Sequence, residues 1–163
     1  MIDFARAFQA LAARDVRFIL VGGAAATAHG SARLTQDVDV VYERSPENIH
    51  RLVAALAPYQ PYLRGAPPGL PFVWDEKTIE RGLNFTLTTD IGDVDLLGEI
   101  AGGGRFEDLI GRTLEIEVFG VRCRCLSLEA LIAVKRAAGR PKDLEAIAEL
   151  EAIRELRDHD EEA

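Results

Sequence analysis

Hydrophobic and polar residues repeat along this chain with the periods of helices and strands. Near the N-terminus, Phe4, Phe8 and Leu11 recur at helical spacing behind Asp3, a residue type that caps helices, so we predict an amphipathic helix over residues 3–14. The same periodicity predicts further helices over residues 24–28, 46–57, 75–81, 128–138 and 141–157, with Ser45 and Ser127 as caps.

Short apolar or alternating runs predict the strands. Residues 16–21 form an almost continuous apolar run, typical of a buried strand, and Gly22 and Gly23 end it. Further strands are predicted over residues 38–42, 83–89, 93–97, 112–119 and 121–126, with hairpin turns at Asp90-Ile91-Gly92 and at Gly120.

The length and the order of these elements predict one domain of the α/β class. The chain has 163 residues, 48% of them hydrophobic, which is enough for one well-buried core and leaves little room for a second. We predict a single domain over residues 1–157, followed by an acidic tail at 158–163 that frays. Five prolines and two glycines make residues 58–71 an irregular segment and a candidate substrate lid.

Charge and cysteine content restrict the partners and the compartment. Acidic residues outnumber Lys plus Arg by 27 to 19, and a net charge of −8 repels nucleic acid unless cations cluster locally. Cys123 and Cys125 alternate along a predicted strand and so share one face, which is a poor disulfide spacing and predicts reduced thiols. No run of the sequence reaches membrane-spanning length, and the first residues lack the pattern of a signal peptide. We therefore expect a cytoplasmic protein with no membrane partner.

Acidic residues in two predicted strands form a candidate metal site. Asp37 and Asp39 are two residues apart, so their carboxylates project from one face of a strand while the neighbouring valines face the other way. Two carboxylates held this close repel each other unless a cation neutralises them, and Mg²⁺ or Mn²⁺ with oxygen ligands does so while bridging to substrate phosphates. Asp95, between Val94 and Leu96, is the candidate third ligand, and Asp93 beside the turn is a weaker one.

The glycine pair adds a candidate phosphate site. After the first strand, Gly22 and Gly23 let a phosphate chain approach the backbone, and the N–H groups that open the next helix supply donors. Phosphates would then lie between this turn and metal-bound carboxylates. That arrangement suits attack on the α-phosphate of an NTP, with Asp95 orienting or deprotonating the attacking hydroxyl.

These residues resemble the DNA polymerase β-like nucleotidyltransferase superfamily, whose motif of two glycines, an acid pair and a later strand acid matches Gly22, Gly23, Asp37, Asp39 and Asp95. A further string resembles the small prokaryotic branch that includes the AbiEii-like toxins: Arg33, Thr35, Asp37 and Asp39 at alternate positions, then Lys135 and Arg140-Pro141-Lys142-Asp143. The resemblance extends over residues 16–150. It implies a mixed sheet flanked by helices, Mg²⁺ dependence and an NTP donor.

The resemblance also implies roles for single residues. Asp37 and Asp39 would bind the metal, with Asp95 completing the site. Lys135, Lys142 and Asp143 would contact the nucleotide or the acceptor. Each also has a simpler interpretation. Lys135 lies at a helical interval where a lysine is commonly on the surface, and Lys142 and Asp143 are ordinary residues for the first turn of a helix. Arg33 and Thr35 would either steer phosphates or hold the loop, and His29 is expected to pack at a helix end and not to act as a base.

The predicted function is transfer of NMP from an NTP to a hydroxyl or phosphate acceptor. A tRNA end, a protein hydroxyl and a small molecule are candidate acceptors, and a homodimer or a cognate toxin or antitoxin is a candidate partner. The alternative is a non-catalytic, nucleotide-binding regulatory or antitoxin-like protein with the same fold. A plain phosphate- or metal-binding module would keep the glycine turn without needing Asp95. Because the motif retains all three acids, we favour the enzyme.

Overall fold

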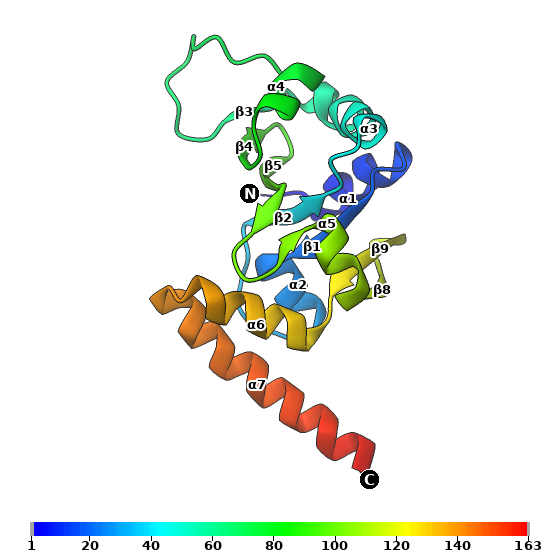
Figure 1. Cartoon of the computed structure of the whole chain (residues 1–163), viewed down its shortest axis with the longest axis vertical. Helices are drawn as coiled ribbons and strands as arrows, with labels where there is room; N and C mark the ends of the chain where they lie inside the picture. Colours follow the sequence, from blue (N-terminus) through cyan, green and yellow to red (C-terminus); the bar gives the residue numbers. More distant parts are fainter. Residues whose placement is uncertain (1, 163) are drawn as a thin grey trace.

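The computed structural model describes residues 2–162 (Figure 1). Its helices are α1 (Phe4–Ala13), α2 (Gly22–Ala28), α3 (Pro46–Leu56), α4 (Glu76–Arg81), α5 (Phe106–Leu109), α6 (Leu128–Ala138) and α7 (Pro141–Glu162), with short 3₁₀ turns at Ala57–Tyr59 and Ile110–Arg112. Its strands are β1 (Phe18–Val21), β2 (Asp37–Tyr42), β3 (Tyr62–Leu63), β4 (Phe85–Thr89), β5 (Gly92–Leu97), β6 (Glu99–Ile100), β7 (Gly104–Arg105), β8 (Thr113–Val118) and β9 (Val121–Leu126).

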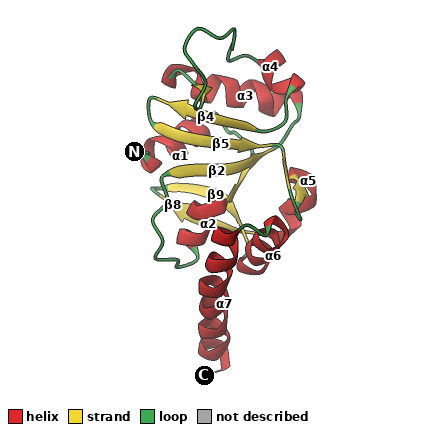
Figure 2. Ribbon diagram, turned by 90° about the vertical axis from the view of Figure 1, so that its left-hand side faces the viewer, coloured by secondary structure: helices red, strands yellow, loops and turns green. Residues whose placement is uncertain are grey.

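Seven strands form one mixed sheet in the order β3-β4-β5-β2-β1-β9-β8. Strand β2 pairs antiparallel with β1 and parallel with β5, while β4–β5 and β8–β9 are antiparallel hairpins, as predicted. Figure 2 shows the helices arranged around this sheet, with α1 beside α3 and α2 beside α6. The predicted fold class, a mixed sheet flanked by helices, is confirmed.

The hydrophobic core explains how the acidic face of β2 is set. Val38 and Val40 are completely buried, whereas Asp37 and Asp39 alternate with them and are only partly covered. Strand β1 is buried along its whole length beside them. Because side chains alternate across a strand, burying the valines forces both carboxylates to the opposite face.

The predicted helix starts are confirmed by their caps. The side chains of Asp3, Ser45 and Ser127 accept hydrogen bonds from the backbone N–H groups of the first turns of α1, α3 and α6. Helix α2 differs from its prediction, because it begins at Gly22 itself and not after the glycine pair.

The tail predicted to fray at 158–163 is helical as far as residue 162, and residue 163 lies outside the described residues. Helix α7, predicted to end near residue 157, continues to Glu162. Residues 158–162 contain neither proline nor glycine, so nothing in them stops a helix. The turn before this segment is anchored, because Arg157 Nη2 donates a 2.9 Å hydrogen bond to the carbonyl of His29.

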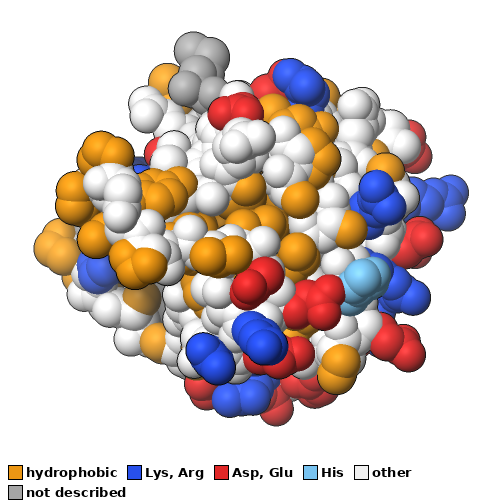
Figure 3. Space-filling view, turned by 90° about the horizontal axis from the view of Figure 1, so that it is seen from above, with side chains coloured by type: hydrophobic (Ala, Val, Ile, Leu, Met, Phe, Trp, Pro, Cys, Tyr) orange, Lys and Arg blue, Asp and Glu red, His pale blue; other side chains and the backbone are white. Residues whose placement is uncertain are grey.

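The proline-rich segment 58–71 is irregular over most of its length, as predicted, but it contributes the short edge strand β3. The hydroxyl of Tyr62 donates to the carbonyl of Pro67 at 2.6 Å and accepts from the N–H of Leu70 at 3.3 Å, which ties the loop to that strand. Leu70 and Val73 are exposed. Figure 3 looks down on this end of the molecule and shows hydrophobic side chains gathered on one side of it.

Residues 98–111, for which no element was predicted, form the β6–β7 pair, α5 and most of a 3₁₀ turn that also takes in residue 112, the first of a predicted strand. Cys123 and Cys125 are free, buried thiols, and burial raises their pKa values to about 11 and about 12. No helix in the described part of the chain is both long enough and apolar enough to cross a membrane.

Candidate active site

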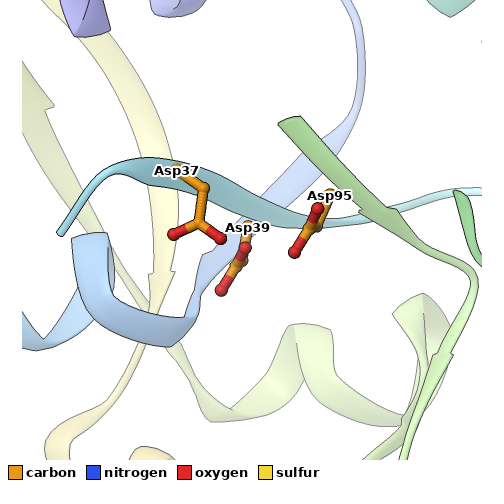
Figure 4. A group of neighbouring side chains, drawn as sticks. All are labelled: Asp37, Asp39 and Asp95. Carbon is orange, nitrogen blue, oxygen red and sulfur yellow. The ribbon is translucent and has the colours of Figure 1, made fainter. Parts of the chain in front are cut away.

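Three carboxylates meet on one face of the β2–β5 pair. The parallel register places Asp39 directly beside Asp95, and Asp37 lies two residues earlier on β2. One oxygen from each of the three side chains lies within 4.8 Å of the others. Figure 4 shows the three carboxylates side by side, projecting from the same face of the sheet. The structure therefore brings together the three acids that the sequence singled out.

The environment of Asp39 disfavours its charge. Burial, followed by the negative charges of Asp37 and Asp95, raises the pKa of Asp39 from 3.8 to about 7. Its Oδ1 is buried and has no hydrogen-bond partner among the described residues. A buried carboxylate oxygen without a partner is costly, and a cation at this point would remove the cost. The all-oxygen donor set fits a hard divalent ion such as Mg²⁺ or Mn²⁺.

Without metal, the contribution of Asp39 to the stability of the protein should fall as pH rises. The folded state holds a proton on Asp39 that the unfolded chain releases above its ordinary pKa of 3.8, so stability is lost as pH rises from about 4 to about 7. We expect the melting temperature in EDTA to decline more steeply over this interval for the wild type than for Asp39→Asn. Added Mg²⁺ should raise the melting temperature most at the alkaline end. Parallel curves for the two proteins would contradict the shifted pKa.

The glycine pair packs against the acid cluster. Gly22 has a φ of +65°, in the left-handed region, and a Cβ there would overlap Oδ2 of Asp39. A Cβ on Gly23 would lie 2.7 Å from Oγ1 of Thr35. Both positions therefore need glycine for close approach to the loop and strand that carry the acids, in addition to the predicted role in phosphate binding.

The two loop residues before β2 have different surroundings. The Thr35 hydroxyl lies 3.2 Å from the carbonyl and 3.3 Å from Oδ1 of Asp37, as a donor to both, which favours a role in holding the loop and orienting that carboxylate. Arg33 is half-exposed and reaches α7, with nitrogens 3.7 Å from Glu145 Oε2 and 3.9 Å from Glu149 Oε1. Of the two, Thr35 alone contacts the acid cluster.

A cavity of about 280 Å³ opens beside Asp39. It lies between the end of β1, the β5–β6 connection and the α6–α7 corner, and is lined by Val21, Gly22, Asp39, Asn84, Leu97, Glu99, Ile100, Ala101, Leu131, Val134, Lys135, Ala138, Arg140 and Asp143. Lys135 forms no ion pair with any residue from 2 to 162. Burial lowers its pKa, and the negative charges of Asp143 and Asp39 oppose that shift. The cavity thus offers an unpaired ammonium group next to the acid cluster.

Arg140 is a cavity residue that the sequence analysis did not include among the site residues. Its Nε donates to Oδ2 of Asp143 at 2.6 Å and its Nη2 to Oδ1 at 3.2 Å, and these bonds lower the pKa of the buried Asp143 carboxyl. Asp143 is therefore occupied in holding Arg140 at the cavity. Lys142, its neighbour, is exposed and does not line the cavity. The sequence signal for Arg140 was its position directly before Pro141, which begins a helix. An acid in the first turn of that helix, here Asp143, can reach the residue before the helix.

Comparison with known proteins found likeness in structure alone. No family model and no curated protein matches the chain. The lincomycin-bound structure of LnuA, a lincosamide antibiotic adenylyltransferase, superposes with a TM-score of 0.56 at 16% identity, over 87% of this chain and 90% of that one. A candidate nucleotidyltransferase from Thermotoga maritima superposes with a TM-score of 0.52 at 16% identity, over 98% of this chain and 96% of that one. The chain has a nucleotidyltransferase fold.

Two further residues of this nucleotidyltransferase fold, His29 and Arg64, make specific hydrogen bonds. His29 is buried at the end of α2 with Nε2 2.7 Å from the carbonyl of Leu126, and burial lowers its pKa, so it packs at a helix end as predicted. Arg64, from the proline-rich segment, was not predicted as a site residue. Its Nη2 donates a 2.7 Å hydrogen bond to Oδ1 of Asp95. The only sequence signal for Arg64 was its place in the candidate lid.

Proposed function

We propose that the protein is a nucleotidyltransferase that depends on Mg²⁺ or Mn²⁺ and transfers NMP from an NTP to a hydroxyl or phosphate acceptor. Asp39 carries this proposal, because its buried Oδ1, which has no hydrogen-bond partner within residues 2–162, lies where three carboxylates meet. The same side chain lines the cavity that holds Lys135 and Arg140. The carboxylates can bind a divalent cation, and the neighbouring Lys135 and Arg140 can bind phosphate oxygens. Together they suit a nucleoside triphosphate, which binds proteins as its metal complex.

The three acids have distinct proposed roles. Asp37, Asp39 and Asp95 hold the divalent cation, which supplies charge neutralisation at the phosphate oxygens when bound. Strand β5 lies on the far side of β2 from Gly22, so we assign the acceptor to this side of the acid cluster and its activation to Asp95. There it orients the acceptor hydroxyl and takes its proton.

The cations of the cavity bind the triphosphate. Lys135 contacts its oxygens, and Asp143 holds the Arg140 guanidinium in place for the same purpose. The acceptor oxygen forms a bond to the α-phosphorus while the bond from that phosphorus to the bridging oxygen breaks. Pyrophosphate leaves with the negative charge, which Lys135 and Arg140 neutralise.

The acceptor and the biological partner are finer proposals. LnuA is described as an adenylyltransferase of lincosamide antibiotics, which supports testing small hydroxyl compounds beside a tRNA end and a protein hydroxyl. The string from Arg33 to Asp39 with Lys135 supports placement in the AbiEii-like branch. A cognate toxin or antitoxin, or a second copy of the chain, is the partner proposed on that ground.

The test is label transfer. The purified protein is incubated with Mg²⁺, each of the four α-³²P-labelled NTPs and, in separate reactions, total tRNA, a protein extract and a small-metabolite extract. We expect label in one acceptor fraction, lost with EDTA. Nucleotide binding without transfer in any reaction would support the regulatory alternative, and absence of both would overturn the proposal.

Removing the Lys135 ammonium should weaken NTP binding. Lys135→Gln should raise KM for the NTP about tenfold, with a smaller effect on kcat, because a partly buried cation contributes about 1–2 kcal/mol to a phosphate contact. Lys77, exposed on α4, provides the matched control, and Lys77→Gln should leave KM unchanged. Lys142→Gln tests the role that the sequence suggested for Lys142. If it matches Lys135→Gln, the nucleotide extends beyond the cavity.

A further inference from the structure

Arg64 links the proline-rich segment to the acid cluster. It follows β3 at the edge of the sheet, and its side chain crosses β4 to reach β5. Its Nη2 donates to the carbonyl of Leu87 at 2.8 Å and to Oδ1 of Asp95 at 2.7 Å, and its Nε lies 3.3 Å from Oδ2 of Asp93. The guanidinium therefore contacts Asp95 from the side opposite to Asp39.

The side chain of Arg64 is held in place from several directions. Its backbone N–H donates to the carbonyl of Thr86 at 3.0 Å, which continues the β3–β4 pairing by one residue. The bond to Leu87 fixes the guanidinium over β4. Its buried Nε has the Asp93 carboxylate within ion-pair distance but makes no well-directed hydrogen bond. A side chain anchored in this way presents a fixed donor to Asp95.

We infer that Arg64 is a positioning residue for Asp95, an inference that rests on the proposed function. The guanidinium engages Oδ1 and so fixes the rotation of the carboxylate, leaving the second oxygen for the cation and the acceptor hydroxyl. It also brings a positive charge next to the cation site, which weakens metal binding there. Arg64 thus has opposite effects on turnover, which it raises, and on metal affinity, which it lowers.

Opposite effects distinguish this role from simple structural support. Arg64→Gln keeps a polar side chain but removes the charge, so the Mn²⁺ dissociation constant, measured by electron paramagnetic resonance without nucleotide, should fall about fivefold. In the transfer assay kcat should fall about tenfold or more, because Asp95 is no longer held. Arg64→Lys keeps the charge but not the planar fork, so Mn²⁺ affinity should stay near that of the wild type while kcat still falls.

Arg122 provides the matched control. It forms an exposed ion pair with Glu115 on the β8–β9 hairpin, with a nitrogen to oxygen distance of 3.6 Å, and Arg122→Gln should change neither Mn²⁺ affinity nor kcat. Unchanged or weaker Mn²⁺ binding in Arg64→Gln would overturn the inference. Tighter binding in Arg64→Lys would do the same. If the wild type binds Mn²⁺ but transfers no nucleotide, the proposed function fails and the predicted effect on turnover fails with it, while the Mn²⁺ titrations of the two Arg64 variants still decide the predicted effect on metal affinity.

Discussion

Asp39→Asn should abolish nucleotidyl transfer while leaving the protein folded. The amide keeps the shape of the side chain but cannot carry the charge that balances a divalent cation, so we expect kcat to fall about a thousandfold or more. Without metal the variant should be at least as stable as the wild type above pH 7, because the buried carboxylate is ionised there beside Asp37 and Asp95. The transfer assay and thermal unfolding in EDTA measure the two effects.

Asp160→Asn is the control, since Asp160 is exposed near the end of α7. It should change neither transfer nor Mg²⁺-dependent stabilisation. Residual transfer near the wild-type rate in Asp39→Asn would rule out the proposed metal site. Loss of folding in that variant would instead assign Asp39 a structural role.

Gly22→Ala should have the second largest effect, because it damages stability and the site together. The new Cβ would overlap Oδ2 of Asp39 at a φ of +65°, so either the strand end or the carboxylate has to move. We expect a loss of about 3 kcal/mol or more in the free energy of unfolding, together with loss of transfer.

Gly120→Ala separates the two contributions. Gly120 has a φ of +75° in the β8–β9 turn, and apart from its chain neighbours no described residue would lie within 4 Å of a Cβ there, so its replacement costs only the backbone conformation, about 1 kcal/mol. The double variant Gly22→Ala/Asp39→Ala should recover part of the stability lost in Gly22→Ala, since one overlapping group is gone. Chemical denaturation measures the free energies of unfolding. If Gly22→Ala and Gly120→Ala lose equal amounts, the close approach of Gly22 to Asp39 does not contribute to the cost of the substitution.

Both predictions concern acids that a local sequence pattern reveals. The alternation of Asp37, Val38, Asp39 and Val40 is a local pattern, and it predicted a strand with a buried face and an acidic face. Asp95 was identified in the same way, from its apolar neighbours. The structure confirms the strands and brings the three carboxylates together, because β2 and β5 are parallel neighbours in a register that pairs Asp39 with Asp95.

The residues that the sequence analysis missed are those whose role depends on distant partners. Arg64 is 31 residues from Asp95 and reaches it only because β3 adds to the sheet edge beyond β4. Arg140 enters the cavity because α6 and α7 meet at a corner that local periodicity does not describe. Helix α7 is likewise held at Arg157 by a contact with His29, far away in the chain.

The sequence by itself determined the α/β class, most helix and strand positions, the helix caps and the acidic face of β2, because hydrophobic periodicity and capping act between residues close along the chain. Only the tertiary structure decided the pairing of β2 with β5, the overlap that makes Gly22 necessary, and the cations that face the acids. These depend on which surfaces the packed core brings into contact, and no local pattern contains that information.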